Sequence, residues 1–321
     1  MRHKITRMKH AILGLHHVTA TVDDAQQDLD FCIEVLGMRL VKKTVNFDNH
    51  HVYHFYYGDE RGTPGTIWTT FPYKARGVRI GVKGAGQVCT TAFSVPDSSI
   101  AFWENRLRQS GAATGRGETR FDEPVLTVAD PSGLYFELVG TGADARRPWT
   151  GNGTATDEAI RGLHNVTMVV HSADATIGLM TGVLGYQVVR QSGPRTRLAA
   201  GSDAPGHFID VVEDASAPTA INGLGTVHHV AMAIATPEEQ LALRDDLLQR
   251  GLRVTEVRDR CYFQSIYFRE PGGVLFEVAT MQPGFTVDEE LPELGRALKL
   301  PPWEEPFRAE IEAGLAAVSY R

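Results

Sequence analysis

Two histidine pairs and one carboxylate are the residues of this sequence best suited to chemistry. The pairs His16-His17 and His228-His229 each lie in a segment whose residues alternate as in a β-strand. Glu277 interrupts the otherwise apolar segment GVLFEVA. Burying an unpaired carboxylate is costly, and a divalent cation would offset that cost. Two imidazoles and one carboxylate that leave coordination positions open form the facial arrangement typical of non-haem Fe(II) oxygenases.

Strand geometry predicts which histidine of each pair is available to a cation. Adjacent residues on a strand point to opposite faces of the sheet. His17 and His229 share their faces with small or polar residues, whereas His16 and His228 share theirs with bulky apolar residues. The bulky face is expected to pack on a helix, and the other face to line a concavity. We therefore predict that the metal ligands are His17, His229 and Glu277.

Internal repeats indicate which elements position these residues. GLHHVT at 14–19 returns as GLHNVT at 162–167, and DPSGLYFELV at 130–139 returns as EPGGVLFEVA at 270–279. Two different repeats at similar offsets imply two similar halves, each built from two modules. Within a module the pattern is a strand, a helix and then further strands. The last module shows it best, with a predicted helix that begins after Thr236.

These patterns predict an α+β fold of four βαβββ modules in two similar halves, with mixed curved sheets that form open clefts. Residues 10–140 are predicted to hold the first pair of modules, and residues 161–280 the second pair. The segment 141–160, rich in Gly, Thr and Ala, is the predicted linker. Residues 281–321 match no module and form a predicted C-terminal helical extension, in which apolar spacing around Ile311 suggests a docking helix.

The modules without the chemical residues provide an internal control. Asn165 stands where the first module has His17. Thr90 stands where the last module has His229, and Glu137 is retained without a histidine partner. One cleft is therefore expected to contain metal ligands and the other to lack them. The first and last modules should then form the metal site together.

Composition excludes several other classes of protein. The 321 residues include 32 basic and 39 acidic side chains, a net charge of −7, and no basic block suggests nucleic-acid binding. No apolar run approaches the roughly 20 residues of a membrane helix. The three cysteines, Cys32, Cys89 and Cys261, are odd in number and widely spaced. They argue against a disulfide scaffold and favour a cytoplasmic location.

The motifs resemble the vicinal oxygen chelate superfamily and, more narrowly, its hydroquinone-type ring-cleaving dioxygenases. The resemblance covers nearly the whole chain and rests on GLHHVT, the second HHVA, EPGGVLFE, YHFYYGDERGTPGTIWTTFP at 53–72 and GFTVDEELPELG at 284–295. It implies Fe(II), with Mn(II) as the alternative because both ions accept such ligands. The ligands that it implies are the same His17, His229 and Glu277.

The resemblance also implies a group of catalytic residues around the metal. These are His16, Thr19, His228, Arg260 and Tyr267. Tyr267 and the two non-ligand histidines are expected to transfer protons or to orient oxygen. Arg260 is expected to hold a substrate anion or a developing oxyanion. Alternation predicts that His16 and His228 point towards the core. A catalytic role for them therefore requires that their rings turn towards the cleft at the start of each strand.

The implied activity is O₂-dependent opening of a hydroquinone- or catechol-type ring. The expected partners are a small aromatic substrate and O₂, with a homo-oligomer left open and with neither nucleic acid nor membrane. One alternative is a glyoxalase-like metal-dependent lyase or isomerase, which Thr69 or Thr70 at the fourth corner of the site disfavours because such enzymes use more carboxylate or Gln ligands. The other is a metal-free binding protein of the same fold, which the complete His-His-Glu set disfavours.

Two further features carry weaker expectations. His50 and His54 share a strand face and His51 points away from it, so these histidines are expected to form a structural or pocket-edge group. Cys261 stands where relatives carry glycine, which is expected to change the shape of the pocket.

Overall fold

The computed structural model describes residues 11–320, so residue 10 of the predicted first half lies outside the described part. Each of the four modules runs strand, helix, strand, strand, strand. The first holds β1 (Gly14–Val22), α1 (Ala25–Asp30), β2 (Arg39–Asn46), β3 (Asn49–Gly58) and β4 (Ile67–Pro72). The second holds β5 (Gln87–Val95), α2 (Ile100–Gln109), β6 (Thr114–Arg116), β7 (Val125–Ala129) and β8 (Tyr135–Gly140).

The second half repeats this order. The third module holds β9 (Gly162–Val170), α3 (Asp174–Gly182), β10 (Gln187–Ser192), β11 (Arg195–Ala199) and β12 (Phe208–Glu213). The fourth holds β13 (Thr226–Ile234), α4 (Pro237–Gln249), β14 (Arg258–Asp259), β15 (Gln264–Arg269) and β16 (Leu275–Thr280). Short helical turns are η1 (Phe31–Val35), η2 (Asp97–Ser99), η3 (Phe285–Val287), η4 (Leu291–Glu293) and η5 (Glu305–Phe307), and the final helix is α5 (Arg308–Gly314).

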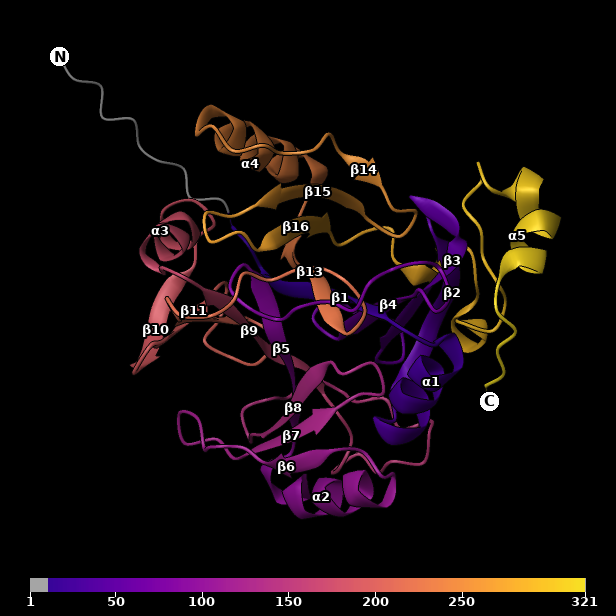
Figure 1. Cartoon of the computed structure of the whole chain (residues 1–321), viewed down its shortest axis with the longest axis horizontal. Helices are drawn as coiled ribbons and strands as arrows, with labels where there is room; N and C mark the ends of the chain where they lie inside the picture. Colours follow the sequence, from indigo (N-terminus) through magenta and orange to yellow (C-terminus); the bar gives the residue numbers. More distant parts are fainter. Residues whose placement is uncertain (1–10, 321) are drawn as a thin grey trace.

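The strands form two mixed sheets of eight strands each (Figure 1). The first sheet has the order β14-β15-β16-β13-β1-β4-β3-β2, and the second has the order β10-β11-β12-β9-β5-β8-β7-β6. The first sheet therefore joins the first and last modules through the antiparallel pair β1–β13. The second joins the two middle modules through β5–β9. This architecture confirms the predicted α+β class of four βαβββ modules in two similar halves.

Helices and aromatic side chains complete the core. Helix α4 begins as predicted, with the Thr236 hydroxyl accepting a hydrogen bond from the backbone N–H of Glu239 and with Pro237 in the first turn. In Figure 1, α4 lies over the first sheet and α2 lies beneath β6 and β7 of the second sheet. Trp68 of β4 packs edge-on against Phe136 of β8, with ring centroids 4.9 Å apart, and so ties the two sheets together.

The C-terminal extension covers the outer edge of the first sheet. Lys42 of β2 is completely buried and donates hydrogen bonds to the carboxylates of Asp288 and Glu289. The predicted docking helix is the short α5, and Ile311 is its buried residue. The exposed edge of a sheet is a pairing hazard, and this segment (yellow in Figure 1) protects β2 from it.

Between residues 11 and 320, no helix is long and apolar enough to cross a membrane. Cys32, Cys89 and Cys261 are all free thiols. The structure therefore contains no disulfide among these three residues, as the sequence predicts.

Candidate metal centre

The register of the first sheet brings the predicted ligands onto one face. His17 of β1 lies opposite Ala231 of β13, and Ala231 lies opposite Glu277 of β16. His229 precedes Ala231 by two residues and lies opposite Thr19. Residues directly opposite one another in a sheet share a face, as do residues two apart on one strand. The two imidazoles and the carboxylate therefore project from the same concave face.

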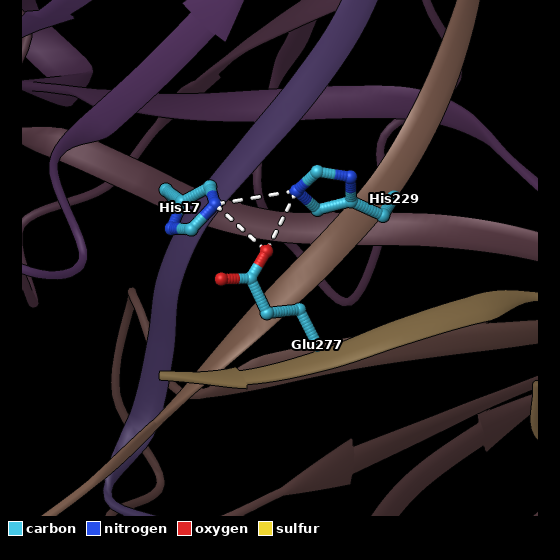
Figure 2. A group of neighbouring side chains, drawn as sticks. All are labelled: His17, His229 and Glu277. Atoms are coloured by element: carbon cyan, nitrogen blue, oxygen red, sulfur yellow. Dashed lines mark hydrogen bonds and ion pairs between the residues drawn. The ribbon is translucent and has the colours of Figure 1, made fainter. Parts of the chain in front are cut away.

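The donor atoms of the three side chains converge (Figure 2). The Nε2 atoms of His17 and His229 are 3.3 Å apart. Oε2 of Glu277 lies 3.3 Å from Nε2 of His17 and 2.8 Å from Nε2 of His229. All three side chains are buried, and Glu277 has no exposed surface. Within residues 11–320 this is the one group of three or more potential ligands that could hold a metal ion.

The geometry of this cluster fits a metal ion better than it fits internal hydrogen bonding. Although Oε2 of Glu277 is close to two ring nitrogens, no donor among the described residues reaches it in hydrogen-bonding geometry. Ligand atoms about 2.1 Å from one ion and at right angles to each other are about 3 Å apart, which is close to the separations observed. The donor set, two neutral nitrogens and one carboxylate oxygen, suits a divalent first-row metal.

The electrostatics keep the carboxylate ionised. Burial raises the pKa of Glu277, but the nearby imidazoles of His17 and His229 more than offset this effect and hold the pKa well below its usual range. The second oxygen, Oε1, accepts a hydrogen bond from the hydroxyl of Ser265. Burial also lowers the pKa of His229, which favours the neutral imidazole that a metal requires.

A β-bulge beside each predicted ligand changes the orientation of the neighbouring histidine. The β1–β13 register shifts between Leu15 and His17, so His16 has no residue opposite it, and a second shift leaves His228 unpaired. Bulges are frequent next to active sites, where they re-aim a side chain. Here they bring Nδ1 of His16 to 2.9 Å from Nδ1 of His17, and Nδ1 of His228 to 2.8 Å from Nδ1 of His229.

Strict alternation stops at a bulge, and the two rings have different positions: His228 lines the cavity, whereas His16 is buried as the alternation predicts and contacts His17. Burial lowers the pKa of both rings to about 3, with a further contribution from the adjacent imidazole in each case. A neutral ring at this position can accept the Nδ1–H of the neighbouring histidine, which leaves the Nε2 lone pair of that neighbour free for a cation.

A cavity of about 640 Å³ opens above the three donors. That volume lies in the range typical of small-molecule sites. His228, Arg260 and Tyr267 line it together with the three donors, whereas His16 and Thr19 are buried and do not line it. Besides Tyr267, the phenylalanine and tyrosine side chains that line it are Phe47, Tyr56, Phe71, Tyr73 and Phe263.

Tyr267 and Arg260 form a polar pair on one side of the cavity. Tyr267 lies opposite Glu277 in the sheet, and its hydroxyl accepts a hydrogen bond from Nε of Arg260 at 3.0 Å. Burial, followed by the charge of Glu277, raises the pKa of Tyr267, so the phenol stays protonated. Arg260 also contacts Asp48 at 3.2 Å across the cavity mouth.

Thr69 connects the buried Thr19 to His54, which lines the cavity. Thr69 of β4 lies opposite Thr19 and donates a hydrogen bond to it at 2.8 Å. His54 of β3 lines the cavity and lies 3.0 Å from Oγ1 of Thr69. Of the predicted structural or pocket-edge group, His54 lines the cavity, and His50 and His51 do not. His50 instead contacts Glu304 of the extension at 2.7 Å.

Cys261 occupies a backbone conformation that favours glycine. Its φ angle is +63°, in the left-handed region. Its side chain does not line the cavity and packs near Tyr262 and Phe263. The residue at this position therefore affects the turn that carries Arg260 more directly than it affects the cavity wall.

The chain belongs to a known superfamily. A family model described as the Glyoxalase/Bleomycin resistance protein/Dioxygenase superfamily matches residues 14–138 and 162–278, which together span most of the four modules. Glyoxalase I from Zea mays superposes with a TM-score of 0.62 at 15% identity over 83% of this chain and 92% of that chain, so it shares the fold alone.

Relatives of higher identity carry more specific names. The chain is 44% identical over 298 residues to MhqE of Bacillus subtilis (strain 168), named as a ring-cleaving dioxygenase, covering 93% of this chain and 96% of MhqE. It is 35% identical over 306 residues to the chlorohydroquinone/hydroquinone 1,2-dioxygenase of Sphingobium indicum, covering 93% and 94%. The crystal structure of a Bacillus subtilis protein named as a dioxygenase superposes with a TM-score of 0.92 at 40% identity, covering 98% and 99%.

Proposed function

We propose that this protein is an Fe(II)-dependent ring-cleaving dioxygenase that opens hydroquinone- or catechol-type aromatic rings with O₂. The observation that carries the proposal is the convergence of His17, His229 and Glu277 at the floor of an aromatic-walled cavity. The names of its relatives support the reaction class, since these are ring-cleaving and hydroquinone dioxygenases.

The three donors would hold the ion by one face and leave the cavity side open. When bound, Fe(II) supplies the redox chemistry with O₂ and lowers the pKa of a phenolic hydroxyl at its open positions. Every coordinating side chain comes from a central strand of one sheet, which is a rigid support. A dioxygenase incorporates both atoms of O₂ into the product, so the ring itself supplies the electrons and no external reductant is needed.

His16 and His228 would act as positioning residues. Each neutral ring accepts the Nδ1–H of its neighbour, which fixes the tautomer of His17 and His229 with Nε2 available to the cation. Each also leaves one ring nitrogen for other contacts, and His228 reaches the cavity. Because His228 lines the cavity, we also propose that it transfers protons to or from the substrate.

Tyr267 and Arg260 would act directly on the substrate. The phenol of Tyr267 is held protonated beside Glu277, so it can donate a hydrogen bond or a proton to an oxygen atom in the cavity. The guanidinium of Arg260 stabilises negative charge that develops on the same oxygen. Thr19, hydrogen-bonded to Thr69, would maintain the spacing between β1 and β4.

The proposal is tested by anaerobic reconstitution with Fe(II), followed by O₂ uptake with hydroquinone and catechol. We expect one equivalent of iron and one O₂ consumed for each ring opened. His17→Ala should lose both the iron and the uptake. Iron binding without O₂ uptake across a panel of such diols would contradict the dioxygenase and favour a lyase or isomerase. Unchanged metal content in His17→Ala would contradict the assigned site.

A further inference from the structure

His54 is a half-buried histidine that lines the cavity and is not one of the three proposed metal ligands. It lies on β3, and the strand order places β3 and β15 on opposite sides of β1 and β13. His54 therefore faces the cavity from the side opposite Tyr267 and Arg260. Strand β3 is two places from β1 in the sheet, and two strand spacings amount to about 10 Å. The backbone of His54 therefore lies well away from the three donors on β1, β13 and β16.

The hydrogen bonds around His54 define its tautomer. Thr69 has one hydroxyl hydrogen, and it donates that hydrogen to Oγ1 of Thr19. With the hydroxyl hydrogen of Thr69 assigned to the contact with Thr19, Oγ1 of Thr69 acts as the acceptor at 3.0 Å from Nε2 of His54, and Nε2 carries the hydrogen. In a neutral imidazole the other nitrogen then has a free lone pair. Burial, followed by the charges of His17 and Arg260, lowers the pKa of His54 well below its usual value, so the ring is neutral.

The ring is also held in place by its neighbours. Its centroid lies 4.0 Å from that of Tyr56 and 4.3 Å from that of Phe71, two aromatic walls of the same cavity. Within residues 11–320, Nδ1 of His54 has no hydrogen-bond partner, and it is not among the buried unsatisfied atoms. Nδ1 therefore presents an acceptor of fixed direction to the cavity.

We propose that His54 is a specificity-determining residue whose Nδ1 accepts a hydrogen bond from the para hydroxyl of the substrate ring. The inference rests on the proposed function and assigns to His54 the recognition of the substituent para to the metal-facing hydroxyl. With one hydroxyl oxygen of a hydroquinone at the metal, the second lies on the far side of the ring, towards His54. The second hydroxyl of a catechol is adjacent to the first and does not reach it.

The selection follows from the chemistry of the acceptor. A para hydroxyl donates its hydrogen to Nδ1 of His54. A para methoxy group has no hydrogen to donate, and the lone pair of its oxygen is repelled by the lone pair of Nδ1. A site built to hydrogen-bond a substrate hydroxyl rejects analogues that lack it. His54 therefore distinguishes hydroquinone from 4-methoxyphenol, although the two molecules share the ring and the metal-facing hydroxyl.

Ligand binding to Zn(II)-loaded protein tests this inference without turnover. Calorimetry should show hydroquinone binding about 10-fold more tightly than 4-methoxyphenol, the effect of one good hydrogen bond. In His54→Phe the preference should fall to about 1. His54→Gln, whose side-chain oxygen is also an acceptor, should restore part of it. Thr69→Val should weaken it, because Nε2–H loses its acceptor and the tautomer is no longer fixed.

The outcomes separate this inference from the proposed function. If the Fe(II) protein opens hydroquinone but His54→Phe keeps the 10-fold preference, the role of His54 is overturned while the dioxygenase stands. If the wild-type protein neither binds diols nor consumes O₂, the proposed function itself fails. Equal zinc content in wild type, His54→Phe and His54→Gln shows that the metal site is intact, and a preference lost together with zinc would overturn the assignment to Nδ1.

Discussion

The two sheets of this protein have the same backbone plan but different side chains around their equivalent glutamates, Glu277 at the first predicted cleft and Glu137 at the second. In the second sheet, register shifts in β5–β9 leave Cys89 and His164 unpaired, at the positions that correspond to His228 and His16 in the first sheet. The bulges are thus a property of the module pair and do not depend on the predicted metal ligands. Their presence in both sheets shows that the local geometry for a site exists twice in the chain.

The side chains in the two clefts offset their buried charge in different ways. Glu277 is in contact with two imidazoles and has an oxygen without a hydrogen-bond donor. Its counterpart Glu137 accepts two hydrogen bonds from Arg120, at 2.6 and 2.8 Å. A bidentate guanidinium satisfies both carboxylate oxygens and supplies the positive charge that a cation would bring. The second cleft therefore has no electrostatic need for a metal.

The same arginine position has opposite roles in the two sheets. Arg120 corresponds to Arg260, at the offset of 140 residues that separates the repeated turns. In the first sheet the tyrosine on β15 holds Arg260 at 3.0 Å and keeps it away from the carboxylate. The second sheet has Thr127 at the position of that tyrosine, opposite Glu137, so the arginine reaches Glu137 instead. The residue opposite the carboxylate, Tyr267 in the first sheet and Thr127 in the second, therefore differs together with the partner of the arginine.

The largest effect is expected from the two glutamates. Glu277→Gln removes the anionic ligand, so we expect metal content to fall below a tenth of the wild-type value and O₂ uptake with hydroquinone to fall at least 100-fold. The matched variant Glu137→Gln should keep both, and should lose about 1–3 kcal/mol of unfolding free energy because Arg120 loses its partner. Metal analysis and chemical denaturation measure the two effects, and a metal-depleted Glu137→Gln would contradict the comparison.

Substitutions of the two bulge histidines, His16 in the first sheet and His164 in the second, should differ in their effect on Fe(II) affinity. His16→Phe removes the acceptor that fixes the tautomer of His17, so affinity for Fe(II) should fall about 10–100-fold. His164→Phe changes the equivalent position of the second sheet, where the neighbour is Asn165, and should leave Fe(II) affinity unchanged. Anaerobic competition with a chelator gives both affinities. Equal losses in the two variants would show that the effect comes from the fold and not from the site.

The two arginines should separate catalysis from stability. Arg260→Ala should lower kcat/KM with hydroquinone about tenfold, while the metal content stays the same. Arg120→Ala leaves a buried carboxylate without its partner, and should cost about 3 kcal/mol of unfolding free energy with kcat/KM unchanged. Oxygen-electrode kinetics and urea denaturation of both variants test this exchange of roles. An Arg120→Ala protein that keeps its stability but loses kcat/KM would contradict the assignment of stability to Arg120 and catalysis to Arg260.

A smaller difference between the halves lies outside the clefts, at Asp28 and its counterpart Thr176. Burial raises the pKa of Asp28 to about 6, although hydrogen bonds from Thr70 and Tyr57 oppose the shift. A raised carboxyl pKa means that the ionised form is disfavoured in the folded state. Its contribution to stability is therefore complete below about pH 4 and is lost as the pH rises through 6.

Asp28→Thr, which installs the residue of the third module, should reduce this pH dependence by up to about 3 kcal/mol between pH 4 and pH 7. The measurement is the unfolding free energy from urea denaturation at several pH values. Asp30→Thr, on the same helix but exposed, is the control and should leave the profile unchanged. A wild-type profile that rises with pH over this interval, and is unaltered by Asp28→Thr, would contradict the assigned burial effect.

Sequence patterns were sufficient to predict the fold and to bring the three donors together. The repeats predicted four modules, and alternation along the strands placed His17, His229 and Glu277 on one face, as the structure has them. These signals are local and periodic, so they can be read without knowledge of tertiary contacts. The catalytic roles of the surrounding residues stay predictions.

The features that the sequence did not predict depend on register and on packing between distant segments. A bulge adds one residue to one strand, so His228 departs from the alternation that was used to place it. His54 is separated from the donors by β4, and its role depends on the hydroxyl of Thr69. The pairing of Arg120 with Glu137 depends on a turn in which Phe121 has a positive φ angle.

Anomalous diffraction at the iron edge, from crystals of the anaerobically Fe(II)-loaded protein, tests the central claim most directly. We predict one anomalous peak per chain, within bonding distance of Nε2 of His17, Nε2 of His229 and Oε2 of Glu277, and none beside Glu137. A peak beside Glu137, or no peak among the three donors at full iron occupancy, would contradict the assignment of the two clefts.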